Sequence, residues 1–473
     1  MPPAAGAPAV GSMRRGSVRT LLAAAAATAL FLPLGPVSTA DHLPPMVPEV
    51  LAGFALTPLV AAPVPTALAW GPNLGADLPS VATGPDLYMT TLANGVWRVD
   101  LEWTPTGPVV HGAAQIAGGF TQPLGLLWGE TLDAASPAGA IAPPLYVADS
   151  HPGAESGRTD GRITRLDVTG ITATGLATAT RTAVVDGLPN GRHNTNHMRW
   201  GPDGLLYVAN GNPNDNGVQG GAPDVHPYSG AILRFDAVEV SISPAVFRWR
   251  NANGQPIPPD QLATHAVNAD FVAKVDSFAY GFRNVFGIAH RDGAWYTATN
   301  GADNPASQDT LYRIVEDADH GFPACFDVGR PGAVGAEIGK VASPTFPGAD
   351  CTTQPKATAL LGWHTCTTGL DFPTTGMWQF PPAMQDSVFV AECATFFAQS
   401  WFARTLADPT RGTHNTSHKV VRVPLRQDGQ AMEVQDFVTG LALPTDVLFG
   451  PDGSMIIADA GALYRVAPLL STV

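Results

Sequence analysis

The sequence predicts an all-β protein, a six-bladed β-propeller with four-stranded antiparallel blades. Three observations support this fold class. Fifty glycines and 44 prolines in 473 residues favour many short elements joined by turns. A strand–turn–strand phrase recurs six times along the chain, and each copy is followed by a third strand of similar sequence. A ring of small, similar sheets explains such a pattern, whereas a β-sandwich does not require the same sequence pattern to occur six times.

The clearest copy of the phrase is WGPDGLLYVANG, residues 200–211. It contains an apolar strand end, a Gly-Pro-Asp-Gly turn with proline at the second position, and an alternating strand. Residues 449–461, FGPDGSMIIADAG, repeat it closely, and residues 287–301 and 370–392 repeat it more loosely. The second strands of the six copies are LYMTT (87–91), LYVAD (145–149), LYVAN (206–210), WYTAT (295–299), VFVAE (388–392) and MIIAD (455–459).

A third strand follows each copy, and an arginine recurs at the same place in all of them. The third strands are GVWRVD (95–100), GRITRLD (161–167), GAILRFD (230–236), DTLYRIV (309–315), HKVVRVP (418–424) and GALYRVA (461–467). The recurring arginines are Arg98, Arg165, Arg234, Arg313, Arg422 and Arg465. A residue that every blade repeats serves the blade, so we expect these arginines to be structural. The functional residues should be those that break the repeat.

Residues 1–40 are expected to be an export signal, followed by a single propeller domain over residues 41–473. A basic segment (MRRGSVR), a short apolar run interrupted by proline and a small-residue cleavage pattern (PVSTA) are typical of such signals. No other apolar run has spanning length, so we expect a soluble protein without a membrane span, secreted or periplasmic. The formal charge of −14 argues against nucleic acid as a partner. The four cysteines fit an oxidising compartment, and their number leaves three pairings open.

The candidate site lies where the loops before the first strands of the blades open on one face of the ring. Several blades contribute side chains to one concavity there. The residues at these positions are Thr121 and Gln122, His193 and Asn194, Arg283 and Asn284, His364 and Thr365, and Ala442 and Leu443. A histidine base beside an arginine cation suits proton abstraction next to a developing oxyanion.

Simpler interpretations of the same residues remain open at this stage. His193 could be a turn residue, and Arg283 with Asn284 could satisfy backbone carbonyls in a loop. His364 could be a histidine of the rim with no ligand. His197 is expected to point into the packed face of its strand and to be structural.

At these positions the chain resembles the glucose/sorbosone dehydrogenase family, exported six-bladed propellers that use pyrroloquinoline quinone (PQQ). The similarity covers nearly the whole chain after residue 40 and depends on the order and spacing of five segments. These are LPNGRHNTNHMRWGPDG (188–204), YGFRNVFGIAH (280–290), DADHGFPAC (317–325), HTCTTGLDF (364–372) and SHKVVRVPL (417–425).

The resemblance implies oxidation of an aldose or similar alcohol at PQQ, with an electron acceptor that the sequence does not identify. His193 would be the general base, and Arg283 would stabilise the quinone oxygen as charge builds on it. The implied cofactor-binding residues of the funnel are Arg283, Asn284, Gln122, His364 and Lys419. The resemblance also implies a Ca²⁺ ion, held at Gly301, Ala302 and Asp303.

Blade five departs from the family pattern at two places, and both changes introduce a cysteine. Beside the resemblance, this predicts a Cys366–Cys393 disulfide between neighbouring strands of one blade. Cys325 and Cys351 would then pair in the loop between blades four and five. A long insertion, about residues 237–278, is expected between blades three and four.

Two other functions are compatible with the same fold, because a fold alone does not determine activity. The first is a calcium-dependent lactonase or esterase, which needs carboxylates converging on the channel; Glu130, Asp149 and Glu392 are the candidates. The second is a non-catalytic propeller that binds a glycan or a protein partner through the funnel.

Overall fold

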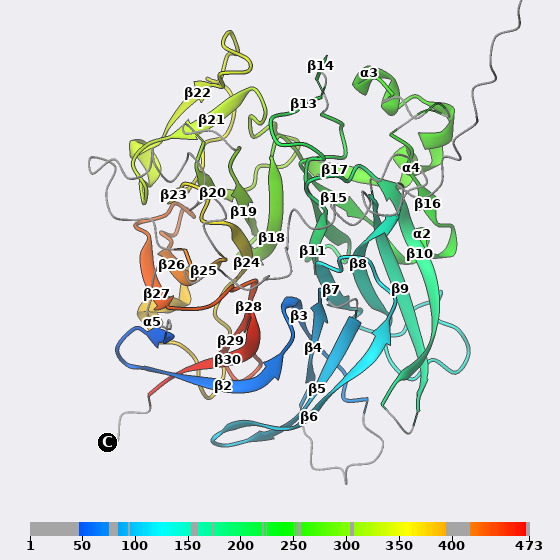
Figure 1. Ribbon diagram of the computed structural model, residues 1–473, viewed down its shortest axis with the longest axis vertical. Helices are drawn as coiled ribbons and strands as arrows, with labels where there is room; N and C mark the ends of the chain where they lie inside the picture. The colour runs from blue at the N-terminus through cyan, green and yellow to red at the C-terminus, as the bar shows by residue number, and fades with distance from the viewer. Residues whose placement is uncertain are drawn as a thin grey trace, which may run out of the picture.

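The structure is a computed structural model, and six sheets arranged around an axis form it (Figure 1). The residues it describes are 47–74, 84–92, 95–152, 159–172, 175–219, 222–223, 225–249, 251, 253, 257–302, 307–393 and 417–469. The predicted fold class, a six-bladed β-propeller, is confirmed. The expected export signal, residues 1–40, lies outside the described residues.

Most strands of each blade come from consecutive segments of the chain, as the repeat predicts, but blades two, five and six each add a strand from elsewhere in the chain. Blade one comprises β3 (Pro65–Gly71), β4 (Asp86–Thr91), β5 (Gly95–Thr104) and β6 (Gly107–Gly118). Blade two comprises β7 (Gly125–Trp128), β8 (Leu145–Pro152), β9 (Thr159–Ile171), β10 (Ala177–Leu188) and the short strand β16 (Ala245–Val246). Blade three comprises β11 (Thr195–Trp200), β12 (Leu206–Asn210), β15 (Ala231–Phe235) and β17 (Asp276–Ala279).

In the other three blades, β1 and β2 from the start of the described chain join blades five and six. Blade four comprises β18 (Asn284–Arg291), β19 (Ala294–Asn300), β20 (Asp309–Arg313) and β23 (Ala359–Gly362). Blade five comprises β24 (Thr367–Asp371), β25 (Ser387–Glu392), β26 (Lys419–Pro424), β27 (Gln435–Thr439) and β1 (Glu49–Val50). Blade six comprises β28 (Asp446–Phe449), β29 (Met455–Asp459), β30 (Gly461–Pro468) and β2 (Phe54–Ala62).

Two small sheets and a few short helices complete the described structure. The two-stranded sheets are β13 (Val218–Gln219) with β14 (Ala222–Pro223), and β21 (Cys325–Val328) with β22 (Gly339–Ala342). The helices are α2 (Ala237–Ile242), α3 (Pro259–Leu262), α4 (Ala269–Lys274) and α5 (Pro382–Gln385), with 3₁₀ turns at Ala266–Asn268 and Gly335–Glu337. No helix within these described segments is long and apolar enough to cross a membrane.

The ring is closed by pairing the two ends of the described chain. Strand β2 pairs antiparallel with β30, from Phe54 opposite Pro468 to Ala62 opposite Gly461, and the blue and red ribbons lie side by side in Figure 1. The first strands of the blades contact one another in circular order, β3, β7, β11, β18, β24, β28 and back to β3. Because the sheets meet in a ring, their inner strands surround one central channel.

Side chains of the first strands bond each blade to its neighbour. The hydroxyl of Thr66 donates to the carbonyl of Pro123 (2.6 Å), and that of Thr445 donates to Pro65 (2.7 Å). The hydroxyl of Thr368 likewise donates to the carbonyl of Pro444 (3.2 Å). These bonds satisfy carbonyl groups at the seams between blades, where an unpaired polar group would cost free energy.

The recurring arginines are structural, as the repeat predicts. Each of the six donates hydrogen bonds to nearby carboxylates, hydroxyls or carbonyls of the scaffold. Arg165 is buried and bonds the carboxylates of Asp133 and Asp167. Arg234 bonds Asp276 of its own blade and Glu316, which follows the third strand of the next blade.

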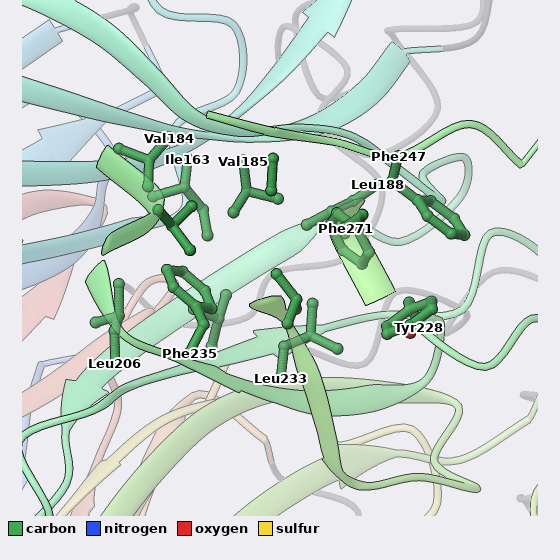
Figure 2. Close-up of a cluster of buried hydrophobic side chains, with 14 of the residues drawn as sticks. Ile163, Val184, Val185, Leu188, Leu206, Tyr228, Leu233, Phe235, Phe247 and Phe271 are labelled. Carbon is green, nitrogen blue, oxygen red and sulfur yellow. The ribbon is translucent and has the colours of Figure 1, made fainter. Parts of the chain in front are cut away.

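The insertion at residues 237–278 lies within blade three, between β15 and β17, and not between blades three and four as expected. It crosses to blade two, where β16 pairs in parallel with β10. In Figure 2 the side chains of Phe247 and Phe271 meet Tyr228, while aliphatic residues of blades two and three fill the space beside them. The ring centroid of Phe271 lies 4.8 Å from that of Phe247 and 4.9 Å from that of Tyr228. The insertion therefore covers the seam between blades two and three with an apolar core.

Replacing Phe271 by alanine should lower the free energy of unfolding by about 3–5 kcal/mol, because it empties a fully buried aromatic site. Val267→Ala, in the same insertion but 48% exposed, should change it by less than about 0.5 kcal/mol. Urea denaturation of both variants measures the difference. Equal stabilities of the two variants would show that the insertion is not part of the core.

Both predicted disulfides are present. Cys366 pairs with Cys393, joining the start of β24 to the end of β25. Cys325 pairs with Cys351, but within blade four, between β20 and β23, and not between blades four and five as expected. This second disulfide belongs to the excursion that carries the hairpin β21–β22, which projects beyond the ring at the upper left of Figure 1.

Candidate active site

The loops entering the first strands meet around a hollow of about 710 Å³ at one end of the central channel, part of which is open solvent. All six blades contribute to its walls. Of the predicted site residues, Gln122, His193 and Asn284 line this hollow, together with Asn194 of blade three. We call this hollow the funnel.

Backbone hydrogen bonds hold the loop that carries His193 against the loop after β12. The amide of Arg192 donates to the carbonyl of Pro213 (2.8 Å), and that of Gly211 donates to Asn194 (2.9 Å). The amide of Asn212 donates to the carbonyl of Arg283 (2.8 Å), which brings blade four to the same place. The backbone of Asn212 therefore bonds both the side chain of His193 and the backbone of Arg283.

The imidazole of His193 is fixed in one tautomer. Its Nδ1 lies 2.6 Å from the carbonyl oxygen of Asn212, and only 6% of the residue is exposed. A carbonyl oxygen can only accept, so Nδ1 carries the proton and Nε2 keeps its lone pair. Burial, and then the positive charge of Arg283, lower the pKa of His193 well below its usual value. The ring is therefore neutral near pH 7, with one nitrogen able to take a proton.

Arg283 is close to His193 but is anchored elsewhere. Its Nε donates to Oδ1 of Asp215 (2.9 Å), and its terminal nitrogen also pairs with this carboxylate. The same carboxylate lies 3.7 Å from the guanidinium of Arg192. Arg283 lines a second, smaller hollow of about 320 Å³ and is not among the residues that line the funnel. The side chains of Arg283 and Asn284, adjacent in sequence, thus border different hollows.

The predicted calcium positions lie at this second hollow. Gly301 and Ala302 line it; the amide of Gly301 donates to Asp309 (2.8 Å) and that of Ala302 to the hydroxyl of Ser307 (2.8 Å). Asp303 falls outside the described residues. Within the described part of the chain, no three acidic, histidine or cysteine side chains gather in a way that could hold a metal. A Ca²⁺ ion here would need oxygen ligands other than a cluster of carboxylates of the described residues.

Two other predicted cofactor residues are not among the described residues that line the funnel. The Nζ of Lys419 pairs with Asp436 (2.7 Å), which compensates its charge, and lies 3.7 Å from Glu392. His364 has a positive φ of 51° and is buried near Asp309; burial raises the pKa of that carboxyl, and its proximity to His364 opposes the shift.

Glu392 occupies an unusual environment at the end of β25. The residue is fully buried, and neither carboxylate oxygen has a hydrogen-bond partner among the described residues. Burial raises the pKa of Glu392 to about 8, although Lys419 opposes the shift. The corresponding residue of blade six, Asp459, instead accepts from the amides of Ala442 and Leu443. In blade five the amide of the entry loop is bonded by Asp309 instead, which accepts from the amide of Cys366 (2.7 Å).

The raised pKa of Glu392 makes stability depend on pH. A carboxyl that ionises at about 8 when folded and near its usual value when unfolded contributes stability that is complete below the unfolded pKa and is lost as the pH rises through 8. The free energy of unfolding should therefore fall by roughly 2–4 kcal/mol between pH 5 and pH 8.5. Glu392→Gln should remove most of that slope in urea denaturation, while Glu130→Gln, at an exposed glutamate, should keep it. Parallel pH profiles of wild type and Glu392→Gln would contradict the assignment.

His197 is buried, in keeping with the expectation that it is structural, and it contacts residues of blades one, four and six. Its Nδ1 is 3.8 Å from the carboxylate of Asp446 in blade six, and its ring packs edge-on against Phe286 of blade four. Burial lowers the pKa of His197 to about 3 and raises that of Asp446 to about 7. Because blade six lies opposite blade three, the contact with Asp446 places the His197 side chain near the axis of the ring.

The carboxylates required by a lactonase do not converge on the funnel. Glu130 is exposed and follows the end of β7, at the opposite face of the ring. Asp149 is buried and accepts from the Arg162 guanidinium (3.1 Å) and the Thr164 hydroxyl (3.1 Å). Neither residue, nor Glu392, is among the described residues that line the funnel.

Asn212 and Asp215 are site residues that sequence reasoning missed. Asn212 fixes the tautomer of His193, and Asp215 anchors Arg283. Both belong to NGNPND, residues 210–215, which follows the second strand of blade three and extends it with polar residues. Blade six has no such polar extension at the equivalent place, and this difference between the copies could have indicated Asn212 and Asp215 as site residues.

Comparisons with solved structures identify the fold. A Trichoderma reesei member of carbohydrate-active enzyme family AA12 has 14% identity and a TM-score of 0.61, covering 91% of this chain and all of its own. The soluble aldose sugar dehydrogenase of Escherichia coli has 15% identity and a TM-score of 0.54, covering 88% of this chain and all of its own. The chain has the fold of soluble sugar dehydrogenases.

A Thermus thermophilus protein described as a putative oxidoreductase (glucose dehydrogenase) agrees with this, at 16% identity, a TM-score of 0.53, and coverage of 88% of this chain and 100% of its own. No protein-family model matches the chain, and no curated protein matches it by sequence. At these identities the likeness concerns the fold, so the activity has to be argued from the site.

Proposed function

We propose that this protein is a secreted or periplasmic oxidoreductase that oxidises an aldose or related alcohol, with PQQ as the hydride acceptor and Ca²⁺ beside it. The observation that carries the proposal is the state of His193. It is a neutral imidazole on the wall of the funnel, with Nδ1 bonded to a carbonyl and Nε2 left as the basic nitrogen. Two disulfides within the described residues support an oxidising compartment.

The residues around the funnel fit a planar acidic cofactor. Asn284 and Gln122 supply amides on its wall, and Arg192 supplies a positive charge. The hydroxyl of Thr367 also lines the funnel; it is buried and has no hydrogen-bond partner among the described residues. A buried polar atom without a partner is costly unless a ligand satisfies it. Backbone oxygens at Gly301 and Ala302 would hold the Ca²⁺ ion in the neighbouring hollow, with Asp303 as a further oxygen ligand.

In this proposal the protein contributes proton transfer and charge placement. When bound, PQQ supplies an acceptor for the hydride that leaves the carbinol carbon. Nε2 of His193 takes the proton of the substrate hydroxyl, and the Nδ1 bond to Asn212 stabilises the imidazolium that forms. Burial keeps His193 neutral beforehand, and Arg283, held rigid by Asp215, adds to this effect by placing a fixed positive charge beside the reaction.

The proposal is tested by adding PQQ and Ca²⁺ together to the purified protein and measuring the melting temperature. Saturating cofactor should raise it by several degrees, because a ligand that binds only the folded state stabilises that state. Ca²⁺ alone is the control for an effect of the ion. An unchanged melting temperature with both present would reject PQQ as the cofactor and favour a propeller that binds a glycan or partner without catalysis.

A further inference from the structure

The funnel has two chemically different halves. Blades three and four supply mostly polar side chains to its walls, with one aromatic ring among them: Arg192, His193, Asn194, Asn196, Asn284, Phe286 and Asn300. Blades six, one and two, which are consecutive around the ring, supply Leu443, Leu92 and Leu124. Leu443 precedes β28, Leu92 follows β4, and Leu124 precedes β7, so each stands at the funnel end of its blade. Blade six lies opposite blade three in the ring, so Leu443 faces the imidazole across the funnel, and Leu92 and Leu124 lie along the arc between them.

The polar atoms on the apolar half are already used by the scaffold. Thr66 and Thr445 line the funnel there, but each donates its hydroxyl proton to a carbonyl of the next blade. The amide of Leu443 donates to the carboxylate of Asp459. Of the described lining residues of blades six, one and two, Gln122 alone brings an amide or charged side chain. A ligand hydroxyl placed against this half would meet methyl groups and leucine side chains.

We propose that the substrate is an alcohol or lactol whose reacting hydroxyl is carried on an apolar body, and that Leu92, Leu124 and Leu443 select for that body. This inference rests on the proposed function, because the hydroxyl is placed at His193. A free hexose carries hydroxyls around its ring, and those facing the leucines would lose water without gaining a partner. An apolar body loses no hydrogen bond there and gains the free energy of burying its surface.

The test compares 2-hydroxytetrahydropyran with D-glucose in the protein reconstituted with PQQ and Ca²⁺. Both present the same lactol group, whose carbon would give up a hydride to the quinone while its hydroxyl gives up a proton to His193, so that a lactone forms. The first lacks every other hydroxyl. Dye reduction should give a kcat/KM at least tenfold higher for 2-hydroxytetrahydropyran than for D-glucose, as expected for groups that fill or fail to fill an apolar pocket.

Leu443→Asn and Leu92→Asn should each reduce that preference by about tenfold. Leu132→Asn, at a leucine that is 52% exposed outside the funnel, is the matched control and should leave the preference unchanged. Melting temperatures of the variants identify any that fail to fold, and the two leucines are changed separately so that one folded variant decides. A kcat/KM higher for D-glucose than for 2-hydroxytetrahydropyran would overturn the inference while leaving the proposed function standing.

A binding measurement separates the two claims if no turnover occurs. Saturation-transfer NMR titrations measure weak affinities of both probes for the wild-type chain. Tighter binding of 2-hydroxytetrahydropyran that Leu443→Asn abolishes, without turnover, would support the apolar half and overturn the oxidoreductase function. Equal affinities for both probes would overturn the inference whether or not the protein oxidises them.

Discussion

His193→Ala should abolish substrate oxidation by the reconstituted protein, lowering kcat by about 10²–10⁴-fold. The variant removes the nitrogen that accepts the hydroxyl proton, and nothing else on the same loop can replace it, because the neighbouring amides of Asn194 and Asn196 are not bases at neutral pH. PQQ affinity should change by less than about threefold, because the proposed role of the imidazole is to accept the substrate proton and not to bind the cofactor. Dye reduction gives kcat, and the shift of melting temperature with PQQ reports binding.

The control for this variant is His111→Ala, at an exposed histidine on β6 that pairs with Glu102 at the surface (2.8 Å). It should retain wild-type turnover. A His193→Ala protein that folds, binds PQQ and turns over at the wild-type rate would assign the base role to another residue. A His193→Ala protein that loses PQQ binding would show that this histidine holds the cofactor.

Arg283→Ala should lower turnover, and it should also move the pH profile. The positive charge of Arg283 disfavours the protonated imidazole and so lowers the pKa of His193. Removing that charge raises the pKa of His193. The acid limb of the kcat/KM profile, which reports the base in the free enzyme, should therefore shift to higher pH. Activity at mildly acidic pH should fall more steeply in the variant than in the wild type.

Arg330→Ala is the matched control, because Arg330 is exposed and pairs with Glu337 at the surface (2.8 Å). Its pH profile should match that of the wild type. An Arg283→Ala profile with an unchanged acid limb would mean that the two groups are not electrostatically coupled. A shift to lower pH would contradict the sign of the interaction.

The fold was predictable because each repeat can be recognised in the sequence strand by strand. The turn Gly-Pro-Asp-Gly and the alternating strand after it recur closely enough to place the strands of the ring. Two excursions were assigned to the wrong place, the insertion at 237–278 and the segment that carries the Cys325–Cys351 disulfide. Both lie between the third and fourth strands of a blade. The fourth strands are short or variable in sequence, so the boundaries between blades could not be read there.

The sequence predicted which loops border the candidate site, but not which side chains of those loops line the funnel. Arg283 and Asn284 are adjacent, yet one borders the smaller hollow and the other the funnel. Successive side chains point in different directions, and an error of one residue in a strand boundary reverses such an assignment. Lys419 was placed by resemblance alone, and its partners Asp436 and Glu392 come from neighbouring strands that only the folded sheet brings together.

The central claim is that a neutral imidazole on the funnel removes a proton from an alcohol while a bound quinone takes the hydride. The most direct measurement is the rate of substrate-dependent dye reduction by the protein saturated with PQQ and Ca²⁺, compared with the His193→Ala variant under the same conditions. The account predicts reduction that requires both substrate and PQQ and disappears in the variant. Saturated cofactor without substrate-dependent reduction, across lactols and aldoses, would contradict it.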